Sequence, residues 1–117
     1  MKRDIEIIRR LLLKAEAAEV GEVISVTDPT DANHVALLVD EGFVKARLVE
    51  VDGDGIIGAR IFRLTNQGHD FIQSAMDQTI WNKMKDTIIK PGAAWTLALV
   101  AEYLKQEAKR HLGMNLD

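Results

Sequence analysis

Hydrophobic residues at helical spacing mark three long segments of the chain. They recur every three or four positions over residues 3–18, with basic residues between them, which predicts an amphipathic helix. The same spacing over 65–90 predicts a long central helix that Pro91–Gly92 ends. A last helix is predicted over 94–112, with Gly113 after it as a cap.

The middle of the chain has the pattern of strands. The segment VISVT at 23–27 is short and rich in β-branched residues, which predicts a single strand followed by a turn at Asp28–Pro29. Residues 45–51 and 58–64 flank the segment VDGDGII. Its Gly-Asp-Gly centre supplies the backbone freedom that a tight connection needs, so these two segments predict a β-hairpin.

A short helix is predicted before the hairpin, over residues 31–41. Thr30 or Asp31 can cap its start, and Gly42 ends it. Thr65 is a second predicted cap, because its hydroxyl can accept from a backbone amide two or three residues later at the start of the central helix.

Taken in order, these elements predict one α+β domain over 1–117 with the outline of a winged helix-turn-helix. Residues 1–90 form its core, the hairpin is the wing, and two additional helices follow, of which 91–117 is a candidate dimerisation element. The helix that normally braces the recognition helix across the DNA backbone is shortened or missing, because a strand and a turn occupy residues 19–30.

Three stretches of the sequence resemble one known family. They are MKRDIEIIRRLLL at 1–13, HVALLVDEGFV at 34–44 and RLTNQGHDFIQSAMDQTIWNKMK at 63–85. Together they are similar to domain of unknown function 2513, a family of small bacterial and phage or prophage proteins. Asn66 stands where that family often has tryptophan after LT. The resemblance implies a winged-helix-like fold and a mobile-element setting, and it implies no particular activity.

Composition narrows the function classes. The chain of 117 residues is 47% hydrophobic and 28% charged, as in an ordinary soluble protein, and no apolar run is long enough to span a membrane. No secretory cleavage pattern follows the N-terminal segment, so we expect a cytoplasmic protein. The absence of cysteine excludes disulfides and a thiol nucleophile, and no motif predicts a metal or other cofactor.

Double-stranded DNA is a candidate partner, although the net charge of -3 is unfavourable unless the cations are gathered locally. Asn33 and His34 occupy the N-terminal part of the predicted recognition helix and could lie near base edges. Acidic neighbours and the lack of Lys or Arg there favour a helix that only packs. The wing provides candidate phosphate contacts at Lys45, Arg47, Arg60 and Arg63, with Asp52 and Asp54 at its tip opposing that use.

Other motifs give weaker signals for chemistry. VDGDG resembles the start of an EF-hand loop, but the loop continues with isoleucine where the next oxygen ligand belongs, so we expect no calcium site. His69 and Asp70 are adjacent, yet neighbours on a helix point about 100° apart and no nucleophile accompanies them. We therefore expect no catalytic residues and no enzymatic activity.

Two functions follow from this pattern. The first is a DNA-binding transcriptional regulator that acts as a homodimer. The alternative is a protein–protein interaction module that keeps the winged scaffold without binding DNA. The predicted dimer contacts lie along the last helix, whose apolar face is broad; they are Trp95, Leu99, Leu104 and Ala108.

Overall fold

The chain forms two compact units in a computed structural model, which describes residues 1–92 and 94–116 and the side chains as far as His111. Unit 1 is Met1–Ile72 and unit 2 is Gln73–Asp117. The fold class is α+β, with a three-stranded antiparallel sheet in unit 1. The organisation of 1–117 as one domain, with a core over 1–90, stays a prediction.

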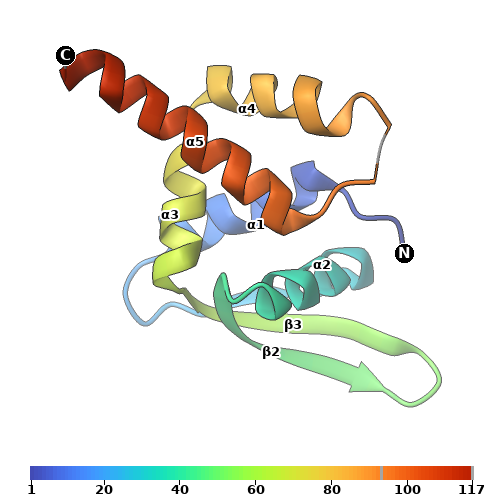
Figure 1. The fold of residues 1–117 in the computed structure, drawn as a ribbon. Helices are drawn as coiled ribbons and strands as arrows, with labels where there is room; N and C mark the ends of the chain where they lie inside the picture. The colour runs from blue at the N-terminus through green and yellow to red at the C-terminus, as the bar shows by residue number, and fades with distance from the viewer. Residues whose placement is uncertain (93, 117) are drawn as a thin grey trace. The chain divides into compact units, whose positions relative to one another are not determined.

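Unit 1 contains the elements that the sequence predicts up to the central helix (Figure 1). In order they are α1 (Ile5–Ala17), β1 (Ile24–Val26), α2 (Pro29–Asp40), β2 (Val44–Val51), β3 (Gly55–Leu64) and the first part of α3 (Asn66–Ala75). Across the described residues 27–43, α2 is the only helix between β1 and β2. These residues hold no second helix beside α2.

The start of α2 corrects one predicted cap. Asp28, and not Thr30 or Asp31, is the N-cap: its carboxylate accepts from the backbone amide of Asp31 at 3.0 Å. Pro29 takes the first helical position, where its missing N–H costs nothing and its fixed φ suits the helix. The Asp28–Pro29 pair therefore starts this helix directly, in place of a separate turn.

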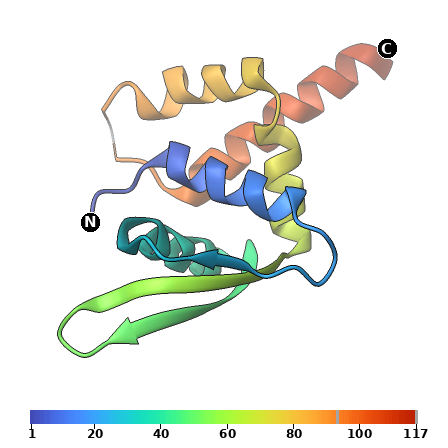
Figure 2. The ribbon, with the colours of Figure 1, turned by 180° about the vertical axis from the view of Figure 1, so that it is seen from behind.

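The sheet has the strand order β1-β3-β2, and α1 and α2 pack on one of its faces (Figures 1 and 2). Strand residues alternate between the two faces, so every second side chain joins this helix-covered side. The unit's core is apolar and closed to solvent, as its most buried members show: Ile8, Leu12, Val35, Leu38 and Ile61. Burial of these side chains is the main force that holds the helices to the sheet.

The LT-x-x-GHDF segment locks the end of the hairpin to the start of α3. Thr65 accepts from the backbone amide of Gly68 at 3.1 Å, which confirms the predicted cap, and its hydroxyl donates to the carbonyl of Gly42. A Cβ atom on Gly68 would overlap the carbonyl oxygen of Phe43. The rings of Phe43 and Phe71 pack with centroids 5.0 Å apart. The motif thus specifies the close packing of the start of α3 against the backbone at Gly42 and Phe43.

The helix predicted over 65–90 is wrong as a single element, because it is interrupted. α3 ends at Ala75, and Asp77 then caps α4 (Gln78–Met84) by accepting from the amide of Ile80 at 3.0 Å. A π-helical turn, η1 (Lys85–Ile89), follows. A side-chain cap inside the apolar stripe therefore splits the helix without any proline or glycine.

The last helix, α5, is longer than predicted. It spans Leu97–Leu116, and Thr96 caps it by accepting from the amide of Leu99 at 3.0 Å. The predicted stop at Gly113 is wrong, since the helix continues past it. Of the helices in the described part of the chain, none has the length and apolarity that crossing a bilayer requires.

Candidate functional site

The sheet face opposite α1 and α2, which we call the outer face, gathers the four wing cations. Arg47 on β2 lies directly opposite Arg60 on β3, and Lys45 lies directly opposite Arg63. Directly opposed residues project from the same side of a sheet, so all four stand on one face. We call each of these directly opposed pairs a rung. Ser25 on β1 pairs with Arg60 and so extends that rung to the third strand. All of these side chains are exposed.

A β-bulge at Phe62 makes this clustering possible. Ala46 pairs with Ile61 and Lys45 pairs with Arg63, so Phe62 has no partner on β2. In a regular strand, residues three apart face opposite sides, and Arg60 and Arg63 would be separated. The bulge brings both to the outer face together with Phe62, whose side chain is 46% exposed.

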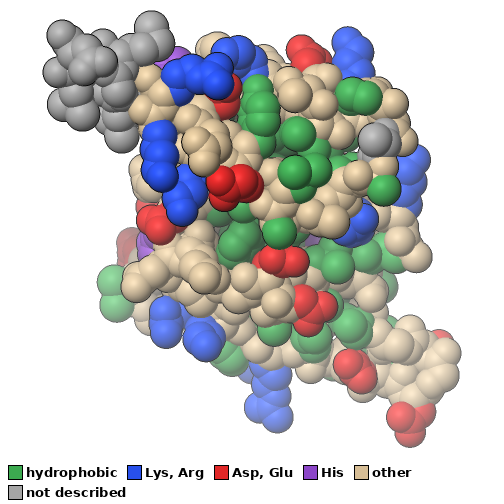
Figure 3. Space-filling view, viewed as in Figure 1, with side chains coloured by type: hydrophobic (Ala, Val, Ile, Leu, Met, Phe, Trp, Pro, Cys, Tyr) green, Lys and Arg blue, Asp and Glu red, His purple; other side chains and the backbone are tan. Residues whose placement is uncertain are grey.

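The cations of the outer face are largely uncompensated. Among the described residues, Lys45, Arg47 and Arg60 form no salt bridge within 4.0 Å, and the Arg63 guanidinium donates to the carbonyl of Leu64 at 3.1 Å. Figure 3 shows Lys and Arg side chains below the strands and acidic side chains around the hairpin tip. Like charges directly opposite each other on a sheet are destabilising. The face thus carries two unfavourable rungs side by side.

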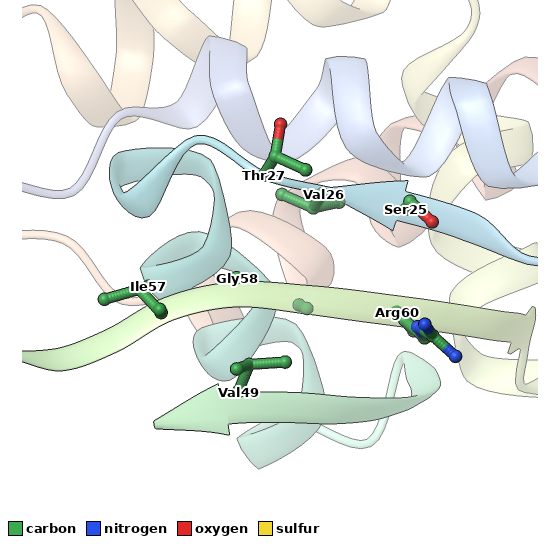
Figure 4. A pocket seen from close by; sticks show the side chains of 8 residues that line it. Ser25, Val26, Thr27, Val49, Ile57, Gly58 and Arg60 are labelled. Carbon is green, nitrogen blue, oxygen red and sulfur yellow. The ribbon is translucent and has the colours of Figure 1, made fainter. Parts of the chain in front are cut away.

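A shallow groove of about 360 Å³ opens on the same face beside these rungs (Figure 4). A second bulge, at Ile57, lies on β3 where Val49 pairs with Gly58 and Glu50 pairs with Ile56. Gly58 leaves the floor of the groove without a side chain. The groove is bordered by apolar and hydroxyl groups with one cation, contributed by Ser25, Thr27, Val49, Ile57 and Arg60.

His34 is a structural residue at the interface of α1 and α2. Its ring is fully buried; Nε2 accepts from the amide of Asp4 at 2.9 Å, and Nδ1 lies 2.8 Å from the carbonyl of Thr30. Because Nε2 accepts, Nδ1 carries the proton and donates to that carbonyl. Both nitrogens are occupied inside the protein, so this geometry does not suit the predicted contact of His34 with base edges.

Asn33 also connects parts of unit 1. Its amide nitrogen donates to the carbonyl of Pro29 at 2.8 Å and to that of Ile56 at 3.1 Å. The second bond ties α2 to the backbone of β3 at a position beyond its pairing with β1. The donor that would recognise adenine is therefore engaged within the fold, and the predicted base contact of Asn33 would require breaking these bonds.

An acidic surface accompanies α2. Asp31 accepts two hydrogen bonds from the Arg10 guanidinium, at 2.7 and 3.0 Å. These bonds hold the pKa of Asp31 below its usual value and raise the pKa of Arg10. No Lys or Arg occurs in residues 28–41, so α2 presents no cation of its own to a phosphate.

His69, the histidine of the adjacent histidine and aspartate on α3, contacts α1. The half-exposed ring of His69 places Nδ1 2.9 Å from a carboxylate oxygen of Glu16 on α1. When His69 is protonated, this contact is an ion pair that joins α3 to α1. Over residues 1–92 and 94–111 there is no cluster of three or more His, Cys, Asp or Glu side chains placed to hold a metal.

The predicted dimer contacts on and before α5 do not share one exposed surface. Leu99 is 46% exposed, and Trp95 and Ala108 are half-buried, whereas Leu104 is 1% exposed within the single chain. Leu104 is therefore part of the interior and offers nothing to a second copy. Dimerisation itself stays a prediction.

Glu107 is a buried charge on α5 that sequence reasoning missed. It is 4% exposed, and its carboxylate lies 3.4 Å from Lys83 on α4 and 3.3 Å from Arg110. A buried carboxylate needs such partners because desolvation is costly. The contacts explain this residue structurally, as a tie between the two helices of unit 2.

Comparison of the sequence with known protein families and proteins places the chain in a family without an assigned role. The family model of the hypothetical protein DUF2513, domain of unknown function 2513, matches residues 2–94. The chain belongs to this family. It is also similar to an uncharacterized protein of Haemophilus influenzae, with 29% identity over 116 residues that cover 93% of each chain. No solved structure matches the chain at a significant level. The phage or prophage setting that the resemblance implies stays a prediction.

Proposed function

We propose that the protein is a non-enzymatic nucleic-acid-binding protein of winged-helix type, with a regulatory role, that holds phosphate groups on the outer face of its sheet. The supporting observation is the pair of like-charged rungs, Lys45 opposite Arg63 and Arg47 opposite Arg60. An arrangement that costs stability without a compensating contact in the fold is typical of a surface shaped for a ligand. A line of phosphates is the ligand that two adjacent cation pairs would match.

The element order supports a winged-helix type of fold, and the internal contacts of α2 favour the wing as the binding surface. A helix, a strand, a helix and a hairpin follow one another as in that fold, with one helix fewer. α2 stands in the recognition position but is flanked by acidic residues, while Asn33 and His34 are engaged internally. The strands, and not α2, are therefore the proposed contact surface.

Charge reversal tests this proposal. The double variant Arg47→Glu/Arg60→Glu changes the charge of one rung by four units, and Lys105→Glu/Lys109→Glu on α5 makes the same change elsewhere. We expect wild type and the α5 control to bind labelled 20-nucleotide DNA at about 50 mM salt, and the rung variant to lose more than ten-fold in affinity. Equal binding by both variants, or no binding by wild type, contradicts the proposal. Circular dichroism checks that each variant is folded.

A protein-interaction module is the second candidate, and one observation favours it. β2 is an edge strand of the described sheet, and Val49 and Val51 on it are 44% and 41% exposed. An open edge with apolar side chains can accept a strand from a partner. In that case changing Val49 to Lys would abolish capture of the partner, while nucleic-acid binding would be absent in wild type as well.

A further inference from the structure

We infer that the ligand of the outer face is a single-stranded nucleic acid, which lays bases on Phe62 and in the groove over Gly58 and phosphates on the neighbouring cation pairs, with the Arg47–Arg60 pair between the two base positions. This inference rests on the proposed function and adds the class of nucleic acid to it. Three features of the face carry it: an exposed ring among cations, a groove without a side chain at its floor, and their spacing along β3.

Phe62 is placed to stack a base. It is a bulge residue that the register leaves without a partner on β2, and it is 46% exposed on the same face as Arg60 and Arg63. A single exposed apolar residue is ordinary. An aromatic ring set between two like-charged rungs is different, because aromatic rings offer their faces to unstacked bases while the flanking cations attract the backbone.

The groove provides a second apolar position. Its floor is the backbone at Gly58, and a Cβ atom there would approach the carbonyl oxygen of Val26 to 3.1 Å. Val49 and Ile57 form apolar walls, and the hydroxyl of Ser25 lies at the border as a donor and acceptor. Figure 4 shows these side chains around the bare strand at Gly58. A planar ring system with polar edges suits such a groove.

The spacing fits an extended strand. Gly58 and Phe62 are four positions apart on β3, or roughly 13 Å at about 3.3 Å per residue, and somewhat less across a bulge. Arg60 lies midway, with Arg47 directly opposite. A strand that lays a base at each of these positions has one further nucleotide between them, and its phosphates lie over the stretch that separates the two bases. The rung thus lies where the backbone would pass between the two base positions.

The same face is poorly suited to a duplex. In a duplex the faces of the bases are stacked inside, so neither Phe62 nor the groove has a base face to contact. Inserting the hairpin tip into a groove of DNA would bring Asp52 and Asp54 close to phosphates, and both are exposed at that tip. Like charges oppose that approach. The single strand is therefore the favoured form.

The test compares strand forms with matched variants. Binding of labelled fifteen-nucleotide oligo(dT), oligo(U) and a mixed-sequence duplex of equal length is measured by fluorescence anisotropy at about 50 mM salt. Wild type should bind the single strands at least ten-fold tighter than the duplex. Phe62→Ala should weaken single-strand binding by roughly 5- to 100-fold and leave duplex binding within two-fold, since stacking acts only on unpaired bases.

Further variants distinguish the loss of aromatic stacking from the loss of apolar contact area in general. Phe62→Trp should retain single-strand binding, Phe62→Leu should lose most of it, and Gly58→Val should weaken it by filling the groove. Val51→Ala, which removes an exposed apolar side chain from β2, should have no effect. Equal affinity for single strands and duplex, with no effect of Phe62→Ala, overturns this inference while leaving the proposed function intact. Absence of all nucleic-acid binding in wild type overturns both.

Discussion

Arg47 and Arg60 face each other directly across β2 and β3, on a sheet surface where, within the described residues, neither has an acidic partner. Lys45 and Arg63 form an equivalent pair one step along the hairpin. A sheet evolving for stability alone would place opposite charges or β-branched residues at such positions. The pairing is therefore the feature of this fold that most requires a functional explanation.

Removing one charge of this pair should relieve the repulsion. We predict that Arg60→Thr leaves stability unchanged or raises it by up to about 1 kcal/mol, because it removes a like-charge contact and adds a β-branched residue. Urea denaturation measures the change. Val49→Thr on the same face adds a threonine without altering charge, and it serves as the control. A loss of more than about 1 kcal/mol on Arg60→Thr would mean that the guanidinium is stabilised by the fold after all.

The close contact between Gly68 and the backbone of Phe43 should leave no room for a side chain at position 68. We predict that Gly68→Ala destabilises unit 1 by at least about 3 kcal/mol. The new Cβ would overlap the carbonyl oxygen of Phe43, and only a shift of the backbone could relieve that overlap. Thermal and urea denaturation measure the loss. Gln73→Ala, at an exposed position of α3, should remain within roughly 0.5 kcal/mol of wild type. If Gly68→Ala matched that control, the close approach would be refuted.

The buried imidazole of His34 should hold the start of α1 in place. Replacing it with alanine leaves the amide of Asp4 without its acceptor, and we predict a loss of about 1–3 kcal/mol in the free energy of unfolding. Hydrogen exchange should accelerate first at the amides of Ile5 to Ile8. Thr30→Ala, an exposed change on the same helix, is the control. A His34→Ala variant with normal exchange in α1 would contradict the assigned contact.

The Arg10–Asp31 pair should make stability depend on acid pH. Arg10 lowers the pKa of Asp31 in the folded state, so the pair stabilises the protein above the unfolded pKa, near 3.8, and this contribution is lost as pH falls through the lower folded pKa. Arg10→Met should cost roughly 0.2–1 kcal/mol at pH 7, since the pair is partly exposed. The difference from wild type should shrink below about pH 4. A double-mutant cycle with Asp31→Asn isolates the pair; no coupling at pH 7 would refute it.

The order and type of elements in unit 1 were predictable from the sequence because apolar spacing and turn residues agree there. The helix before the hairpin, both hairpin strands and the Thr65 cap follow from periodicity and local hydrogen bonding. The interruption after Ala75 was missed because the apolar stripe continues across it. The signal was Asp77, a residue that favours a cap over a helix interior.

The arrangement of the candidate site could be predicted only in part. The four wing cations are evident in the sequence, but strict alternation would put Arg60 and Arg63 on opposite faces. Both arginines stand on one face because of the bulge at Phe62. The position of the bulge is set by pairing with another strand, and no local sequence signal predicts it. The burial of His34 could not be predicted for a related reason: it depends on contact with the start of α1, thirty positions away.

The salt dependence of nucleic-acid binding tests the central claim most directly. If all four outer-face cations contact phosphates, the slope of log K against log salt should be about -2.8 for a single strand or about -3.6 for a duplex. Arg47→Gln/Arg60→Gln should reduce that slope by about half, because two of the four contacts are removed. A slope near zero in wild type, or an unchanged slope in the variant, would show that the outer face does not hold the phosphate backbone.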